Sequence, residues 1–227
     1  MARLARVVVP DVPHHVTQRG NRRQQTFFSD ADYHVYREQL ASSCAMAGVS
    51  VWAWCLMPNH VHLILVPETV DGLRAALADA HRRYSRLVNF REGWRGYLWQ
   101  GRFASVVMDE AHLATAARYV EMNPVRAGLV TRAEDWPWSS ARAHLAGHDD
   151  GLVQVTPLLS RFPDWAGFLD QPIADDALAA IRSGERTGRP LGSDSFVAKL
   201  ETDLGRTLAR QRPGRKPGLS GGKVEYV

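Results

Sequence analysis

The most constraining feature of this 227-residue chain is a pair of strand patterns joined by a two-residue turn. Residues 49–57 and 60–66 are rich in apolar and aromatic side chains, and only Pro58 and Asn59 separate them. A connection this short implies that the two segments pair as an antiparallel hairpin. An antiparallel sheet is therefore part of the predicted fold.

Further strand and helix patterns place this hairpin in a larger order. Strands are predicted at residues 12–20, 49–57, 60–66 and 103–108, and helices at 29–48, 70–89, 110–122 and 135–147. The order β-α-β-β-α-β-α is simplest as an α+β, ferredoxin-like fold, in which helices pack on one face of a four-stranded antiparallel sheet. Within the second strand, one face is expected to carry Val51, Ala53, Cys55 and Met57.

The chain changes character from about residue 151. Pro and Gly breaks become frequent, two helical patches are predicted at 175–183 and 195–210, and residues 211–227 have little to pack. A basic end at residues 206–223 fits either a small DNA-contacting hook or a solvated tail. The division predicted from this change is a first domain at 1–147 and an accessory, basic region at 148–227 that is flexible from about 211.

Composition excludes several classes of protein. The two cysteines, Cys44 and Cys55, lie in apolar surroundings and are expected to be buried free thiols of a reducing compartment. No run approaches the roughly 18 apolar residues of a membrane span, so a cytoplasmic protein without a membrane partner is expected. The formal net charge of +4 is compatible with nucleic-acid binding but does not establish it.

Two histidines begin the third predicted strand. Residues two apart on a strand point to the same face, so His60 and His62 project side by side while Leu63 and Leu65 enter the core. Two imidazoles so placed can bind one divalent cation, with further ligands from another element. Two ordinary strand histidines fit the pattern equally well.

A second motif lies at the end of the third predicted helix. Tyr119 and Asn123 are four residues apart and share a helix face that can lie across the sheet near the histidines. An Asn carbonyl suits a hard divalent ion, and a tyrosine beside a metal-bound phosphodiester is a candidate nucleophile. Taken singly, the two residues are better explained as a packing tyrosine and a helix-capping asparagine.

Together, the two motifs resemble the single-tyrosine HUH transposases, and within them the REP-associated tyrosine transposases. The motifs are Pro-Asn-His-Val-His-Leu-Ile-Leu at 58–65 and Tyr-Val-Glu-Met-Asn-Pro-Val-Arg-Ala-Gly-Leu-Val at 119–130, and the resemblance covers roughly residues 1–147. It implies a catalytic domain in which His60, His62 and Asn123 bind Mg²⁺ or Mn²⁺. It further implies that Tyr119 attacks single-stranded DNA to form a 5′-phosphotyrosine link.

The implied partner is single-stranded or hairpin DNA formed by palindromic repeats. Such DNA requires a positive groove for its backbone, and the candidate residues for that groove are Arg19, Arg22, Arg23, Arg82, Arg83, Arg86 and Arg102. No organic cofactor is expected, and a monomer is favoured over a homodimer. The alternative is a non-catalytic regulator on the same fold, which would bind such DNA without cleaving it.

Overall fold

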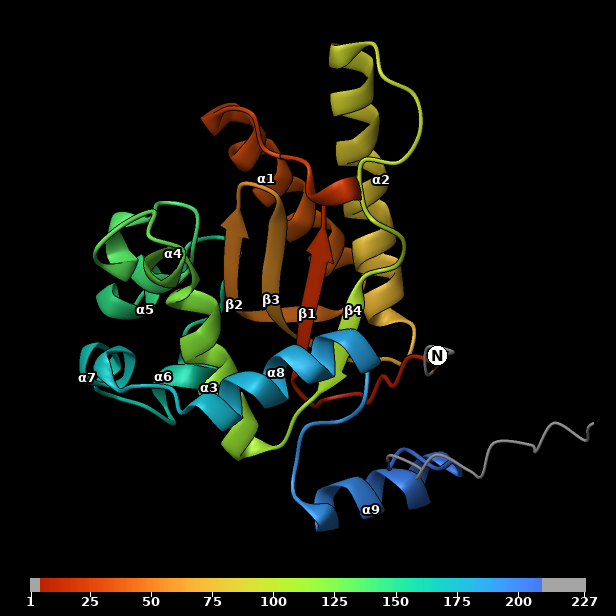
Figure 1. Cartoon of the computed structure of the whole chain (residues 1–227), viewed down its shortest axis with the longest axis vertical. Coiled ribbons are helices and arrows are strands. Elements are labelled where there is room, and N and C mark those ends of the chain that lie inside the picture. Colours follow the sequence, from red (N-terminus) through yellow and green to blue (C-terminus); the bar gives the residue numbers. More distant parts are fainter. Residues whose placement is uncertain (1–4, 210–227) are drawn as a thin grey trace, which may run out of the picture.

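The computed structural model describes residues 5–209, and its centre is one four-stranded sheet. The strands are β1 (His14–Arg19), β2 (Val49–Met57), β3 (His60–Pro67) and β4 (Ala104–Val107), and every pairing is antiparallel in the order β2-β3-β1-β4 (Figure 1). This order confirms the predicted ferredoxin-like topology. Residues 211–227, predicted to be flexible, lie outside the described part.

Two long helices cover one face of the sheet, as predicted. They are α1 (Asp30–Met46) and α2 (Gly72–Glu92), which pack against each other and against the hairpin. Their apolar side chains meet Val16, Leu63 and Leu65 in the larger hydrophobic core. This layer holds the sheet rigid, so that its other face can carry the polar site described below.

The opposite face carries α3 (Glu110–Glu121) and part of the C-terminal region. A second hydrophobic core on this face includes Ile64 of β3, Leu113 and Val120 of α3, and Phe168 of the later helix α7. The remaining helices are α4 (Asn123–Arg126), α5 (Ala141–Ala146), α6 (Thr156–Leu159), α7 (Trp165–Asp170), α8 (Asp175–Thr187) and α9 (Asp194–Leu204), with 3₁₀ turns at Asn21–Arg23 and Ala133–Asp135. Figure 1 shows α8 crossing in front of β1 and β4 beside α3.

The alternation predicted for residues 49–57 is wrong at one point. The pairing of β2 with β3 shifts between Val51 and Ala53, which marks a β-bulge at Trp52. The bulge moves Val51 to the face covered by α1 and α2, while Ala53, Cys55 and Met57 stay on the face of α3. Both cysteines are buried and free, as expected.

Segments distant in sequence cover both edges of the sheet. The N–H of Leu56 donates to the carbonyl of Trp138 (2.8 Å), so the start of the helix predicted at 135–147 is a turn bonded to β2, and α5 begins only at Ala141. Beyond β4, the N–H of Leu191 donates to the carbonyl of Val107 (2.9 Å). In the part of the chain that the structure describes, no helix combines the length and apolar character needed to span a membrane.

Candidate active site

The two histidines of β3 lie on the sheet face that carries α3. The rings of His60 and His62 meet edge to face, with centroids 4.9 Å apart. The Nδ1 atom of His60 lies 2.6 Å from Oδ1 of Asn59, which can only accept, so the imidazole donates and its lone pair is on Nε2. This tautomer leaves Nε2 of His60 free to bind a cation.

A third histidine joins them from β1. Thr17 of β1 pairs with His62, and His15, two residues earlier, points to the same face. The rings of His15 and His62 are stacked with an interplanar angle of 9°, and Nε2 of His15 lies 3.1 Å from Nδ1 of His62. Because His15 is buried, this contact fixes the orientation of the His62 ring.

Tyr119 packs directly against this histidine pair. Its ring meets His62 and His15 edge to face at centroid distances of 5.4 and 5.9 Å, and the guanidinium of Arg126 lies 4.3 Å from its centroid. The tyrosine is 6% exposed. The third helix therefore brings the predicted nucleophile to the predicted metal ligands, with a positive charge over the ring.

Asn123, the third predicted ligand, lies four residues beyond Tyr119. It begins α4 after a break at Met122, and it is buried. Among the described residues, no side-chain hydrogen bond joins Asn123 to His60 or His62. The arrangement thus places Tyr119 at the histidines, while Asn123 stays a predicted ligand.

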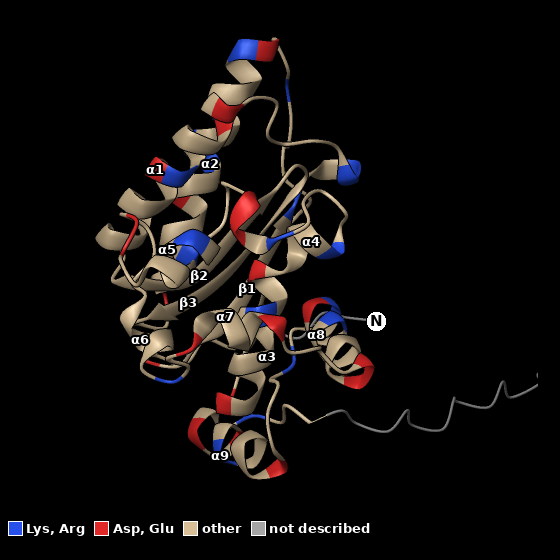
Figure 2. Ribbon diagram, turned by 90° about the vertical axis from the view of Figure 1, so that its left-hand side faces the viewer, with Lys and Arg blue, Asp and Glu red and all other residues tan. Residues whose placement is uncertain are grey.

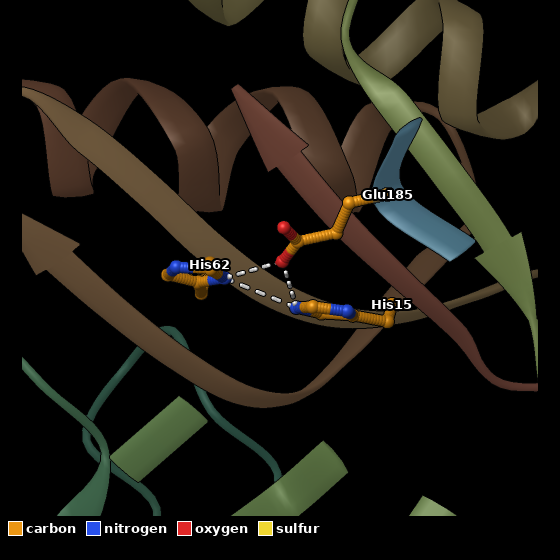
Figure 3. Close-up of side chains that lie close together, drawn as sticks. All are labelled: His15, His62 and Glu185. Carbon is orange, nitrogen blue, oxygen red and sulfur yellow. Dashed lines mark hydrogen bonds and ion pairs between the residues drawn. The ribbon is translucent and has the colours of Figure 1, made fainter. Parts of the chain in front are cut away.

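A carboxylate from far along the chain also lies close to two of the histidines. Oε1 of Glu185, in α8, lies 3.7 Å from Nδ1 of His62 and 4.0 Å from Nε2 of His15 (Figure 3). Among the described residues, these three form a group whose ligand atoms all lie within 4.8 Å of one another. His15, His62 and Glu185 are therefore a candidate metal site.

Burial sets the protonation of this cluster. It lowers the pKa of His15 to about 4, lowers that of His60 to about 4 with help from Arg19, and lowers that of His62 well below its usual range. The imidazoles are therefore neutral near pH 7 and offer lone pairs. Burial also raises the pKa of Glu185, which nearby arginines partly oppose.

The cluster borders an open cavity of about 520 Å³. Its walls include His60, His62 and Glu185 together with two of the predicted DNA-binding residues, Arg19 and Arg102. A cavity with this lining has room for a phosphodiester beside the histidines, and guanidinium groups suit phosphate oxygens.

Two further predicted arginines lie on the turn that follows β1. Arg22 and Arg23 are exposed and have φ values of 53° and 61°, a left-handed conformation that side chains rarely adopt. The amide of Asn59 donates to the carbonyl of Arg23 (3.0 Å) and ties this turn to the residue before His60. The structure thus brings this strained, basic turn next to the site.

The arginines of α2 lie on the opposite face of the sheet from Tyr119. Arg82 and Arg83 pair with Asp79, at 2.6 and 3.5 Å, and Arg86 is exposed. Arg82 also borders a second cavity, of about 570 Å³, that is lined with Tyr97 and other residues up to Phe103. Figure 2 shows acidic and basic residues side by side on the helices, and Arg102 borders both this cavity and the one beside the histidines.

Sequence reasoning missed His15 and Glu185 as site residues. The signal for His15 was present: with Val16 in the core, the alternation of β1 turns His15 toward the other face. No local signal marks Glu185, because its position depends on how α8 packs.

Comparison with known proteins agrees with this fold. Residues 8–123 match the family model described as "Transposase IS200 like". The chain therefore belongs to the IS200-like transposase family.

The relatives of the chain include proteins named as REP-associated tyrosine transposases. The chain is 24% identical over 148 residues to the REP-associated tyrosine transposase of Escherichia coli K12, covering 65% of this chain and 79% of that protein. It is 28% identical over 152 residues, 62% of this chain and 80% of the other, to a Haemophilus influenzae Rd protein provisionally given the same name. A solved structure of a REP-associated tyrosine transposase bound to a REP hairpin matches with a TM-score of 0.52 at 23% identity, over 68% of this chain and 90% of that one. The predicted resemblance is confirmed.

Proposed function

We propose that this protein cleaves and rejoins single-stranded DNA at hairpin-forming palindromic repeats through a covalent link to Tyr119. The observation that carries the proposal is the packing of Tyr119 against His62 and His15 beside a cavity bordered by arginines. Relatives named REP-associated tyrosine transposases, one of them solved with a REP hairpin, support the choice of substrate.

In the proposed reaction the phenolic oxygen of Tyr119 attacks the scissile phosphorus. A bond forms between that oxygen and phosphorus, the bond from phosphorus to the 3′ oxygen breaks, and the phenolic proton is lost while the 3′ oxygen gains one. The products are a 5′-phosphotyrosine and a free 3′-hydroxyl, and attack by another 3′-hydroxyl reverses the step. Because the phosphotyrosine conserves the bond energy, no nucleotide hydrolysis is required.

The proposed ligands for Mg²⁺ or Mn²⁺ are His60, His62 and Asn123. The free Nε2 of His60 and the buried, neutral imidazole of His62 fit this role. A bound divalent ion would neutralise charge on the phosphate as the trigonal-bipyramidal transition state forms. Arg19 and Arg102 would hold the neighbouring phosphates in the cavity.

The experiment that tests this proposal is capture of a covalent adduct. The full chain is incubated with hairpin oligonucleotides from the flanks of its own gene and Mn²⁺, and a denaturant-resistant protein–DNA band is expected. Tyr119→Phe should abolish the band while hairpin affinity stays within about threefold, because only the hydroxyl is lost. The control, Tyr97→Phe, alters an 87% exposed tyrosine and should leave the band unchanged.

An adduct that persists in the Tyr119→Phe variant would refute the role of Tyr119. Hairpin binding without any adduct in the parent, indifferent to chelator, would favour the non-catalytic regulator. His60→Ala and His62→Ala should remove cleavage at metal concentrations that support the parent, whereas His34→Ala, at an exposed position of α1, should not. The monomeric state and the division after residue 147 stay predictions.

A further inference from the structure

The cavity of about 570 Å³ beside α2 has no role in the proposed reaction. It lies between α2 and the segment that runs alongside this helix into β4 (Figure 1). Its apolar walls include Leu77, Leu98 and Phe103. The charged residues at its border are arginines, namely Arg6, Arg74, Arg82 and Arg102, and none of the described residues that line it is acidic. An apolar cavity with positive charge at its border suits an anionic ligand with a flat, apolar body.

We propose that this cavity binds one unpaired nucleotide of the DNA strand that the protein cleaves. The faces of a nucleobase are flat and apolar, and guanidinium groups match the phosphate that follows each base. The inference rests on the proposed function, because that function makes single-stranded DNA the substrate. It adds a base-binding site on the α2 side of the sheet, away from Tyr119.

Shared residues connect this cavity to the one beside the histidines. Arg102 borders both, and it also borders a small cavity of about 30 Å³ that includes Phe103 from one and Glu185 from the other. Residues 101–103 lead into β4, which is an edge strand of the sheet. A DNA strand bound beside His62 can therefore pass round this edge, along Arg102, and reach the cavity beside α2.

The wall of the cavity holds a hydrogen-bond donor without an acceptor. Trp99 is 7% exposed, and its Nε1 atom is buried with no hydrogen-bond partner among the described residues. Aromatic neighbours fix the position of its ring, with centroids 4.7 Å away for His81 and 5.8 Å away for Tyr36. A buried N–H group without an acceptor is costly, and nucleobases carry acceptor oxygens and nitrogens. A base in the cavity can therefore supply the acceptor that the protein does not.

The arginines that α2 contributes are available to a phosphate. Arg74 and Arg82 pair with the aspartates three residues before them, at 3.1 and 2.6 Å, but their side chains are 69% and 76% exposed. Exposed ion pairs of this kind contribute little to stability, so a phosphate can replace the carboxylate as partner at small cost. The border of the cavity therefore favours the backbone of a nucleotide as its walls favour the base.

The test compares two DNA probes in binding to the full chain. One is the hairpin from the flank of the protein's own gene with its native unpaired flanking nucleotides, and the other is the same hairpin without them. Fluorescence anisotropy in the presence of EDTA gives both Kd values without a metal-dependent reaction. The parent should bind the probe with flanks about tenfold more tightly, as expected for one anchored base.

Two matched pairs of variants locate the cause of this preference. Ala78→Glu adds a carboxylate at an exposed position that borders the cavity, and it should reduce the preference to about twofold or less, because charge and bulk both oppose an anionic ligand. Ala75→Glu makes the same change in the same helix at an exposed position that does not line the cavity, and it should keep the preference of the parent. Arg82→Ala should also reduce the preference, whereas Arg132→Ala, at another exposed and paired arginine, should not.

Equal binding of the two probes by the parent would overturn the inference, as would equal preferences in Ala78→Glu and Ala75→Glu. The mononucleotide dTMP tests the other source of the same chemistry. If Ala78→Glu loses binding of dTMP but keeps the preference for flanks, the cavity takes a free nucleotide and the inference is overturned. If circular dichroism shows that Ala78→Glu is unfolded, Arg82→Ala decides in its place.

These measurements separate the inference from the proposed function, because binding is measured without cleavage. If the preference for flanks is lost in Ala78→Glu but the parent forms no adduct with Mn²⁺, the base-binding site stands and the cleavage reaction fails. If Tyr119→Phe abolishes adducts while Ala78→Glu keeps the preference of the parent, the function stands and the inference fails.

Discussion

Glu121 offers the sharpest test of how the tyrosine helix is held. It lies at the end of α3, two residues after Tyr119, and its carboxylate is fully buried. Three groups from the following region donate to it: the hydroxyl of Ser140, Nδ1 of His144 (2.7 Å) and Nε1 of Trp165 (2.8 Å). We predict that Glu121→Gln destabilises the protein by about 2 kcal/mol.

The magnitude follows from counting acceptors. Oε1 of Glu121 serves Ser140 and His144, and Oε2 serves Trp165. Glutamine has one acceptor oxygen, so its NH₂ group must face at least one donor, and a buried donor left without an acceptor costs about 1–3 kcal/mol. The remaining bonds also lose their charge assistance, while the neutral amide is cheaper to bury and offsets part of the loss.

Urea unfolding of the full chain, followed by tryptophan fluorescence and by circular dichroism, measures this loss. Glu110→Gln is the control, because it makes the same substitution in the same helix at a carboxylate that is 68% exposed and paired with Arg161. An exposed pair contributes about 0–1 kcal/mol, so the control should unfold near the parent. If Glu121→Gln and Glu110→Gln lowered the free energy of unfolding equally, the argument that glutamine leaves a buried donor at position 121 without an acceptor would be refuted.

Three other predictions concern stability and DNA binding. Burial lowers the pKa of His81 to about 3, so below pH 6.5 the unfolded chain binds more protons at this residue than the folded chain does. Acidification from pH 6.5 to 5.5 should therefore lower the free energy of unfolding by about 1 kcal/mol at this residue. The variant His81→Gln should lack that part of the measured pH dependence. Gly20→Ala should lower the free energy of unfolding by about 2 kcal/mol, because the new Cβ would lie 2.3 Å from the carbonyl oxygen of Gln24, and an unchanged Tm would contradict this packing. Arg22→Ala should reduce by about 0.7–0.9 the slope of the logarithm of the hairpin binding constant against the logarithm of the salt concentration. Arg132→Ala is the control, because Arg132 does not line the cavity beside the histidines, and it should leave this slope unchanged.

Local patterns were sufficient to predict the strands and the first two helices. The bounds of the hairpin depend on a tight turn and on side-chain alternation, both of which are encoded within a few residues. The β-bulge at Trp52 was not predicted, because one inserted residue leaves the apolar character of the strand unchanged. The helix predicted from residue 135 is shorter because residues 138–140 bond to β2 instead, a pairing that no local pattern indicates.

The residues of the candidate site likewise divide into those that local patterns predict and those that depend on tertiary contacts. His60 and His62 share a strand, so their common face follows from period two alone. His15 requires the register between β1 and β3, and Glu185 requires the packing of α8 on β4, made close by a glycine. The residues that sequence reasoning could not find are those whose position depends on tertiary contacts.

These tertiary contacts converge on one helix. Glu121 joins the C-terminal end of α3 to Ser140 and Trp165, while Tyr119, one half-turn earlier, packs against His15 and His62. A buried carboxylate bound by three donors has essentially one low-energy position, so it restricts both the axial shift and the rotation of the helix that carries Tyr119. A tyrosine that must meet a phosphate in line needs such restriction, because a small displacement of a reacting group costs much of the rate. Ser140 and Trp165, which lie beyond the family-model match, thus restrict through Glu121 the helix that carries the proposed nucleophile.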